Sequence, residues 1–538
     1  MTRKRKAVFA AAAGIVTGFL YAGGRRLDRY DTLDLLEGSF YLEWMRDGIL
    51  AALVFIFLWE LADRIPWDPG NGPAAPGEEK RRLSPPVLHL LQVGILMLCW
   101  LPAFLSIIPG VFSYDAYAEW EQVRNGAITA HHPVIHVLLA GGLPEVFHGL
   151  TGSYNTGIGV YTVLQMFLTA NALSLTVSFL CAKTGARPVW RAAALLFYGF
   201  SPVIQLFAVC TTKDVLFTAC ELLFMVAILG LTGDQNSFFE GKRTGICFVA
   251  VVFGTMILRN NGLYIVLVML AVLFPVCRKY WKKYILLMGG VLFLYGLYSG
   301  PVYRVLSVEP GGIEEMLSVP IQQMARVYHY ERDSLEAADL ELLYRVLPEE
   351  NLQAYKPTVA DPVKSGFIRE GFAANKKELL HLWIDWGLAY PLTYINSFLV
   401  NTVDFWYPGA VVDGYQDPYG RSSYFDYRVA PPGEEIVLLP KLHDFYEKLS
   451  WEKQAQQKPF AFLVLSPGWY FVMFLAVFLY LWRCRRRTLL LPLLIPLLTL
   501  ATALLGPMAL VRYVLIFFYC FPLLAALFLR PSAFEPRD

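Results

Sequence analysis

The sequence predicts an all-α membrane protein with about twelve transmembrane helices, interfacial helices in one outer loop, and a mixed extracytoplasmic domain. Of the 538 residues, 56% are hydrophobic and 17% are charged, and the mean hydropathy is +0.45. This apolar fraction exceeds that of typical soluble proteins, and apolar runs close to the length of a bilayer crossing recur along the chain. A net charge of +2, without a basic cluster that is interleaved with aromatic residues, predicts no nucleic-acid partner.

Each predicted span is an apolar run that ends at charged or turn-forming residues. The runs are 7–24, 47–63, 86–108, 156–181, 189–208, 213–231, 244–258, 261–277, 283–300, 460–482, 487–505 and 508–529. With this number of crossings, both termini lie on one side of the membrane. Lys and Arg gather in the loops on that side, which identifies it as the cytoplasm. The first outer loop does not follow this charge bias, because it carries Arg25, Arg26 and Arg29.

The runs divide the chain into a transmembrane region over 1–300, an extracytoplasmic domain over 301–458 and C-terminal transmembrane helices over 459–538. The domain has 158 residues with 23 acidic and 15 basic side chains, so it is long enough for a core of its own. The outer loop 109–155 contains a moderately apolar stretch that we interpret as an interfacial helix. Counting that stretch as a crossing would invert every later loop against the charge bias.

Asp115 directly follows the third span and is the strongest candidate for chemistry. Ionisable groups at membrane depth are costly, so their default interpretation is functional. A partly desolvated carboxylate has a raised pKa and can serve as a base. The alternative is that Asp115 caps the short helix that follows it.

Four further charged residues fall at the same outer rim as Asp115. Lys213 and Asp214 open the sixth span, and Lys213 calls for an anionic partner because it stands at the positive end of a helix. Arg259 and Arg512 present planar guanidinium groups that bind phosphate through two hydrogen bonds. The alternatives are interfacial snorkelling for Lys213 and ion pairs with Asp214 or Glu221 for the arginines.

The segment His131-His132-Pro133 raises the possibility of a metal site. His132 and His136 are four residues apart, and Asp115 or Glu119 would supply a carboxylate to a divalent ion. Pro133 begins a helix, however, which leaves His132 poorly placed to share a ligand sphere with His136. The residues therefore favour contact with a sugar or phosphate over a metal, with Asp115 and His132 as the candidate metal ligands.

The arrangement resembles the GT-C superfamily of integral-membrane glycosyltransferases, close to its protein mannosyltransferase-like branch and to a poorly characterised bacterial membrane family. The residues that carry the resemblance are Tyr114-Asp115, Thr212-Lys213-Asp214, Arg259-Asn260 and the large outer domain. The sequence departs from the superfamily in having two extra spans before the Asp115 loop and in its His131-His132-Pro133 segment.

This resemblance implies that Asp115 is the catalytic carboxylate and that a polyprenyl-phosphate sugar donor is bound around it. The donor-site residues would be Lys213, Asp214, Arg259, Asn260, Arg512, Tyr513, Tyr114, His131 and His132. The implied reaction is transfer, with inversion, to an extracytoplasmic acceptor, which is a glycan, a protein or a lipid. The competing interpretations are a secondary transporter, an outer-face polysaccharide polymerase or ligase, and a non-catalytic scaffold.

Overall fold

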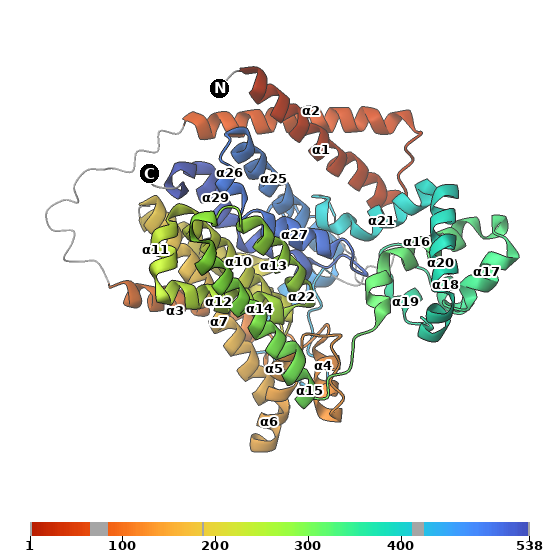
Figure 1. Ribbon diagram of the computed structural model, residues 1–538, viewed down its shortest axis with the longest axis horizontal. Coiled ribbons are helices and arrows are strands. Elements are labelled where there is room, and N and C mark those ends of the chain that lie inside the picture. Colours follow the sequence, from red (N-terminus) through yellow and green to blue (C-terminus); the bar gives the residue numbers. More distant parts are fainter. Residues whose placement is uncertain (1–2, 65–83, 186–187, 411–423, 536–538) are drawn as a thin grey trace.

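The computed structural model describes residues 3–64, 84–185, 188–410 and 424–535. Within these ranges the chain is mostly helical and contains six isolated β-bridges but no β-strand (Figure 1). The all-α prediction is therefore confirmed for the described residues. The prediction of a mixed outer domain is wrong there, because the described part of 301–458 folds as helices joined by turns.

Among the described residues, six helical segments are long and apolar enough to cross a membrane, as in helical membrane proteins. They are Lys6–Tyr30, Pro85–Ser106, Val134–Thr151, Tyr154–Thr184, Lys213–Gly233 and Arg278–Val305. Val134–Thr151 contains the apolar stretch of the 109–155 loop, and its length and composition allow a crossing, so its interfacial location stays a prediction. A seventh arises if α8 (Pro188–Phe200) and α9 (Pro202–Ala208), which meet at a bend of 61°, form one broken span. Twelve crossings are not shown. One reason is that the predicted span 508–529 is divided into η6 (Val511–Val514), α28 (Ile516–Tyr519) and α29 (Phe521–Leu529).

The N-terminal hairpin lies on one side of the bundle (Figure 1), and its two helices pack against each other through small residues. It consists of α1 (Arg3–Tyr30) and α2 (Gly38–Arg64), which make extensive contact with each other. A Cβ atom on Gly18 would lie 2.6 Å from the Cα atom of Gly48, so the two backbones approach as closely as glycine allows.

The central bundle is built around α10 (Lys213–Gly233), the most buried of the candidate spans. Its neighbours are α7 (Tyr154–Thr184), α12 (Lys242–Leu258) and α28. Other helices of the bundle are α3 (Pro85–Ser106), α11 (Gln235–Glu240), α13 (Asn260–Leu273), α14 (Trp281–Leu297), α25 (Pro467–Arg483), α26 (Arg487–Leu490) and α27 (Leu494–Ala503). The helices α4 (Ala116–Asn125), α5 (Val134–Ala140) and α6 (Gly142–Thr151) form the loop before α7.

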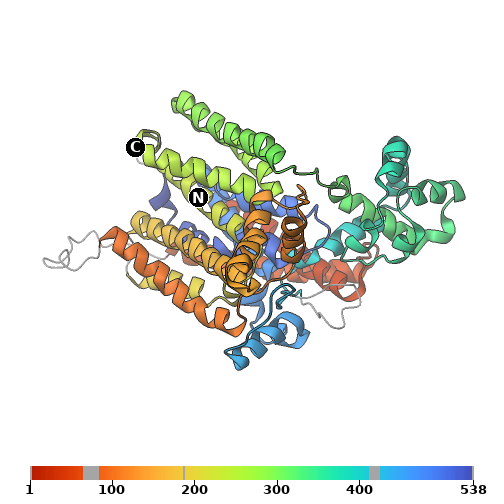
Figure 2. The same cartoon turned by 90° about the horizontal axis from the view of Figure 1, so that it is seen from below.

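The first part of the predicted outer domain has a hydrophobic core of its own, made of residues between Ile321 and Tyr394. Its helices are α16 (Ser318–Glu331), α17 (Ala337–Tyr344), α18 (Glu349–Gln353), α19 (Asp361–Lys364) and α20 (Arg369–Ala389). Figure 2 shows this group to one side of the bundle. The next helices, α21 (Pro391–Trp406) and α22 (Pro440–Trp451), contribute to the main core, and α21 also contributes Tyr394 to the separate core.

Short backbone pairings bring distant segments together around the loop that carries Asp115. Val111 pairs with Cys210 just before α10, and Phe112 pairs with Val429. On the other side, Thr129 pairs with Glu309, and the amide of Ala360 donates to the carbonyl oxygen of Pro507 at 2.8 Å. The start of α10, the loop before η6 and the beginning of the outer segment therefore meet at one place.

Candidate functional site

Asp115 stands at the N-cap position of α4 but does not cap it. Among the described residues, its side chain makes no hydrogen bond to the backbone of the helix. Its carboxylate instead accepts hydrogen bonds from Lys213 Nζ at 2.6 Å and from Arg512 Nη1 at 2.9 Å. The capping alternative therefore does not describe what this carboxylate does, and its contacts are those of an ion-paired group.

Lys213, the first residue of α10, lies among three groups that come from the Asp115 loop. Besides Asp115, its ammonium group lies 3.0 Å from His132 Nδ1 and 3.7 Å from Glu119 Oε1. The anionic partners expected for a cation at a helix start are thus Asp115 and Glu119. Because the lysine side chain is mostly buried, snorkelling to an interface does not describe its position.

Arg512 and Arg259 converge on a second carboxylate, Asp214, which is fully buried. Arg512 Nη1 lies 3.4 Å from Asp214 Oδ2, and Arg259 Nη1 lies 2.8 Å from Asp214 Oδ1. Both guanidinium groups also stand over the ring of Tyr513, at 4.9 and 4.5 Å from its centroid. The structure thus joins all five predicted rim charges in one continuous series of ion pairs, which runs Lys213–Asp115–Arg512–Asp214–Arg259.

Arg259 occupies a tight turn between two helices. It follows the last residue of α12 and precedes the first residue of α13, and the two helices pack against each other. A Cβ atom on Gly262 would lie 1.9 Å from the carbonyl oxygen of Thr255. This close approach requires glycine, and it agrees with a turn rather than one long interrupted helix.

The structure reverses the expected effect of burial on Asp115. Burial by itself raises the pKa of this carboxyl group, but the charges of Arg512 and Lys213 outweigh burial and hold the pKa well below its usual value. The sequence-based expectation of a raised pKa is therefore wrong for this arrangement. As long as both cations remain bound to it, Asp115 is a weak base.

A third carboxylate, Glu119, is also fully buried and begins a chain of hydrogen bonds. Glu119 forms a very short contact with His136 Nδ1, and His136 Nε2 lies 2.8 Å from the hydroxyl of Tyr161. The Tyr161 hydroxyl donates to Gln165, whose amide group donates to the carbonyl oxygen of Cys210 at 2.7 Å. The chain thus returns to the backbone just before α10 and fixes the segment that presents Lys213.

Sequence reasoning placed Glu119 and His136 only in a metal motif and missed this chain. A signal was available, because Glu119 is four residues after Asp115 and shares its face of α4. The partner of Glu119 could not be inferred, because His136 lies on a different short helix whose packing is set by tertiary contacts.

Three other predicted residues line or brace the cluster without joining its ion pairs. The ring of Tyr114 lies under the Arg512 guanidinium group at 4.6 Å, and its hydroxyl accepts from the amide of Asp426. Asn260 donates to the carbonyl oxygens of Ala130 and His131, which ties the Arg259 turn to the loop before α5. His131 Nδ1 lies 3.8 Å from Glu315 Oε1, and the His131 ring packs edge-on against the ring of His132, with 4.4 Å between the centroids.

Asp115, Glu119 and His132 each offer one ligand atom, and these atoms lie within 4.8 Å of one another. The Lys213 ammonium group lies among them and supplies the positive charge. In the described part of the chain, Glu119 Oε1 has no hydrogen-bond partner and points toward this ammonium group. A divalent ion bound by these three residues would have to take the place of the ammonium group.

Over residues 123–535, the sequence matches the protein family described as "Family of unknown function (DUF6020)". The chain belongs to this family. The matched range contains Lys213, Asp214, Arg259 and Arg512 but begins after Asp115 and Glu119. No curated protein and no solved structure matches the sequence.

Proposed function

We propose that the protein is a GT-C-type membrane glycosyltransferase that moves a sugar from a polyprenyl-phosphate donor to an extracytoplasmic acceptor. In this proposal the chain crosses the membrane about twelve times, with both termini in the cytoplasm and 301–458 outside. The observation that carries the proposal is the convergence of Lys213, Arg259 and Arg512 on Asp115 and Asp214 from separate segments.

The positions of the basic loops support this orientation. At the far end of the bundle, Lys6 pairs with Glu60, and Arg486 pairs with Glu535. Gly233 lies beside Phe534 at that end, and α10 separates it from Lys213 by about 30 Å. The candidate site and the helix ends that carry Lys6 and Arg486 are therefore about one bilayer thickness apart. The positive-inside rule places those basic helix ends in the cytoplasm, which puts the candidate site on the outer face.

The ion pairs suggest how a phosphate group enters the site. Among the described residues, the cluster of Asp115, Glu119, Asp214, Lys213, Arg259 and Arg512 holds three carboxylates and three cations. A donor phosphate must therefore take cations from an existing partner. Asp115 is the partner that gives them up most easily, because its side chain is 28% exposed whereas those of Asp214 and Glu119 are fully buried.

The exchange prepares the carboxylate for catalysis. Once Lys213 and Arg512 hold the phosphate, the pKa of Asp115 rises and the carboxylate becomes a stronger base. Asp115 accepts the proton of the acceptor hydroxyl, whose oxygen attacks the anomeric carbon. The bond from that carbon to the phosphate oxygen breaks, and its electron pair stays on the polyprenyl phosphate, which the two cations stabilise. Attack from the face opposite the phosphate inverts the anomeric carbon.

The test is sugar transfer by membranes that contain the wild type or Asp115→Asn, supplied with labelled polyprenyl-phosphate sugars. We expect Asp115→Asn to lower turnover by 10²-fold or more, the order expected for loss of a general base. Glu240→Gln, a change at the exposed last residue of α11, which follows the other end of α10, should keep full activity. Full activity in Asp115→Asn would remove this residue from the mechanism. The size of the labelled product distinguishes the reactions, because a single added sugar indicates a glycosyltransferase and a long added chain indicates a polymerase or ligase.

A secondary transporter is the second candidate, and one observation favours it. Glu221 lies seven residues after Asp214 on α10, is fully buried, and accepts a hydrogen bond from Thr499. Its Oε2 atom has no hydrogen-bond partner among the described residues, and buried intramembrane carboxylates often mark ion pathways. Proton-coupled solute exchange in sealed vesicles that is lost in Glu221→Gln would support this alternative.

A further inference from the structure

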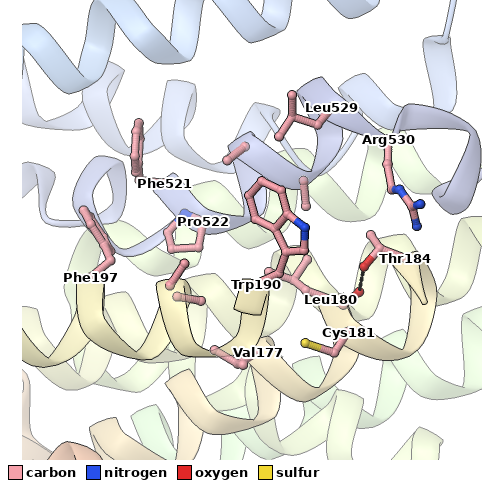
Figure 3. A pocket seen from close by; sticks show the side chains of 14 residues that line it. Val177, Leu180, Cys181, Thr184, Trp190, Phe197, Phe521, Pro522, Leu529 and Arg530 are labelled. Atoms are coloured by element: carbon pink, nitrogen blue, oxygen red, sulfur yellow. Dashed lines mark hydrogen bonds between the residues drawn. The ribbon is translucent and has the colours of Figure 1, made fainter. Parts of the chain in front are cut away.

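An apolar groove of about 200 Å³ lies between α7, α8 and α29, far from the candidate site. Figure 3 shows Phe197 and Phe521 at one end of it, and Thr184 with Arg530 at the other. Almost the whole lining is hydrocarbon, and Arg530 is the charged residue among the lining residues. A groove with this polarity matches a molecule with a hydrocarbon tail and an anionic head.

The position of the groove identifies the leaflet that supplies this molecule. Along α7, Leu180 lies 19 residues after Tyr161, which belongs to the hydrogen-bond chain of the candidate site. At the rise of an α-helix this separation is about 28 Å, close to the thickness of the hydrocarbon core of a bilayer. The groove thus opens at the membrane face opposite the site, beside the end that carries Lys183 and the Arg486–Glu535 pair.

The residues around the groove mark the level of an interface. Trp190 projects into the groove between its two ends and keeps 38% of its surface exposed (Figure 3). Tryptophan is enriched where the headgroups meet the acyl chains, and a cation such as Arg530 attracts the negative charge of the cytoplasmic leaflet. On the outer face of α8, Leu196 and Phe200 are about 60% exposed, as expected of side chains that contact lipid.

We propose that this groove binds one anionic glycerophospholipid of the cytoplasmic leaflet. One acyl chain lies along Phe197 and Phe521, and the phosphate group binds Arg530. The lipid is distinct from the proposed sugar donor, because it enters from the other leaflet. The proposal therefore depends on the membrane orientation but not on the reaction at Asp115.

The test is native mass spectrometry of the purified full chain, titrated with phosphatidylglycerol or with phosphatidylcholine of identical acyl chains. We expect preferential retention of phosphatidylglycerol. Arg530→Gln should weaken its binding about fivefold, the order expected for one cation at a membrane surface. Arg191→Gln, which removes a neighbouring cation of α8 outside the groove lining, should leave binding unchanged.

A second pair of variants tests the acyl chain. Ala194→Phe fills the groove and should abolish retention, whereas Ala192→Phe makes the same change at an exposed position of α8 outside the groove lining and should not. Equal binding of the two phospholipids, or unchanged retention in both Arg530→Gln and Ala194→Phe, would overturn the proposal. The proposal would also be overturned if polyprenyl phosphate displaced phosphatidylglycerol and its binding were weakened by Arg530→Gln and Ala194→Phe. The occupant of the groove would then be the donor lipid.

Discussion

At the scale of single residues, the site is a balanced set of charges in which each buried carboxylate faces at least one cation. Breaking one buried pair costs more than the pair contributes, because the remaining charge stays without compensation. Asp115 differs from Glu119 and Asp214 in being partly exposed. It is therefore the carboxylate whose loss the fold tolerates best and the one that an incoming ligand reaches first.

Glu119 should be far more important for stability than its neighbour Glu121. Glu119→Gln removes the charge that faces His136, Lys213 and His132 inside the protein, and we expect it to lower the free energy of unfolding by about 3–5 kcal/mol. Glu121→Gln changes a side chain that bonds to the exposed Tyr117 and should cost less than about 0.5 kcal/mol. Thermal unfolding of the two variants in detergent measures the difference, and equal stability would contradict the account.

His132 should make the protein less stable in mild acid. Burial and the charge of Lys213 lower the pKa of His132 from 6.5 to about 4. Between these two values the unfolded state binds more protons than the folded state, so the free energy of unfolding falls as the pH drops through this window. The loss is about 3 kcal/mol at its limit.

Thermal unfolding at pH 7 and pH 5 checks this contribution. His132→Asn should unfold at temperatures that depend less on pH than those of the wild type. His148→Asn, at a partly exposed histidine of α6, provides the matched control and should keep the wild-type dependence. Identical pH dependence in the wild type and His132→Asn would show that His132 is not buried in its neutral form.

At the scale of helices, the sequence predicted the convergence of the rim charges because four of the five stand where an apolar run begins or ends, and Arg512 lies four residues into the run 508–529. Asp115 follows α3, Lys213 opens α10, and Arg259 separates α12 from α13. The pairing of Glu119 with His136 depends on how α4 and α5 pack against each other, which the periodicity of neither helix reveals. The number of spans could not be predicted from the sequence either. The hydropathy of an apolar run such as 508–529 does not show where the run divides into shorter helices.

The turn between α12 and α13 should not tolerate a side chain at Gly262. Gly262→Ala places a methyl group 1.9 Å from the Thr255 carbonyl oxygen, so the helices must separate and Arg259 must move away from Asp214. We expect a loss of about 1–3 kcal/mol in the free energy of unfolding, as for other overpacked interiors. Gly289→Ala is the control, since nothing among the described residues lies within 4 Å of its added Cβ atom; equal stability of the two variants would contradict the close approach.

At the scale of the whole molecule, the bundle connects two chemically different ends. One end holds the six-residue charge cluster beside the helices of 301–458, and the other holds basic residues and the apolar groove of α7, α8 and α29. The N-terminal hairpin is fastened to the first end by Arg326, which bonds to the carboxylate and the carbonyl oxygen of Asp31. This polarity is what the proposed function requires, namely a lipid-linked substrate handled at one membrane face only.

The most direct test of the central claim is the affinity of the full chain in nanodiscs for polyprenyl phosphate, compared with polyprenol, which lacks the phosphate. We predict binding of the phosphate and not of the alcohol. Arg512→Gln should bind at least tenfold more weakly, and Asp115→Asn about tenfold more tightly because it no longer competes for the two cations. The account would be contradicted if polyprenol bound as tightly as polyprenyl phosphate, or if Asp115→Asn bound polyprenyl phosphate more weakly than the wild type. Either result would show that a lipid phosphate does not replace Asp115 as the partner of Lys213 and Arg512.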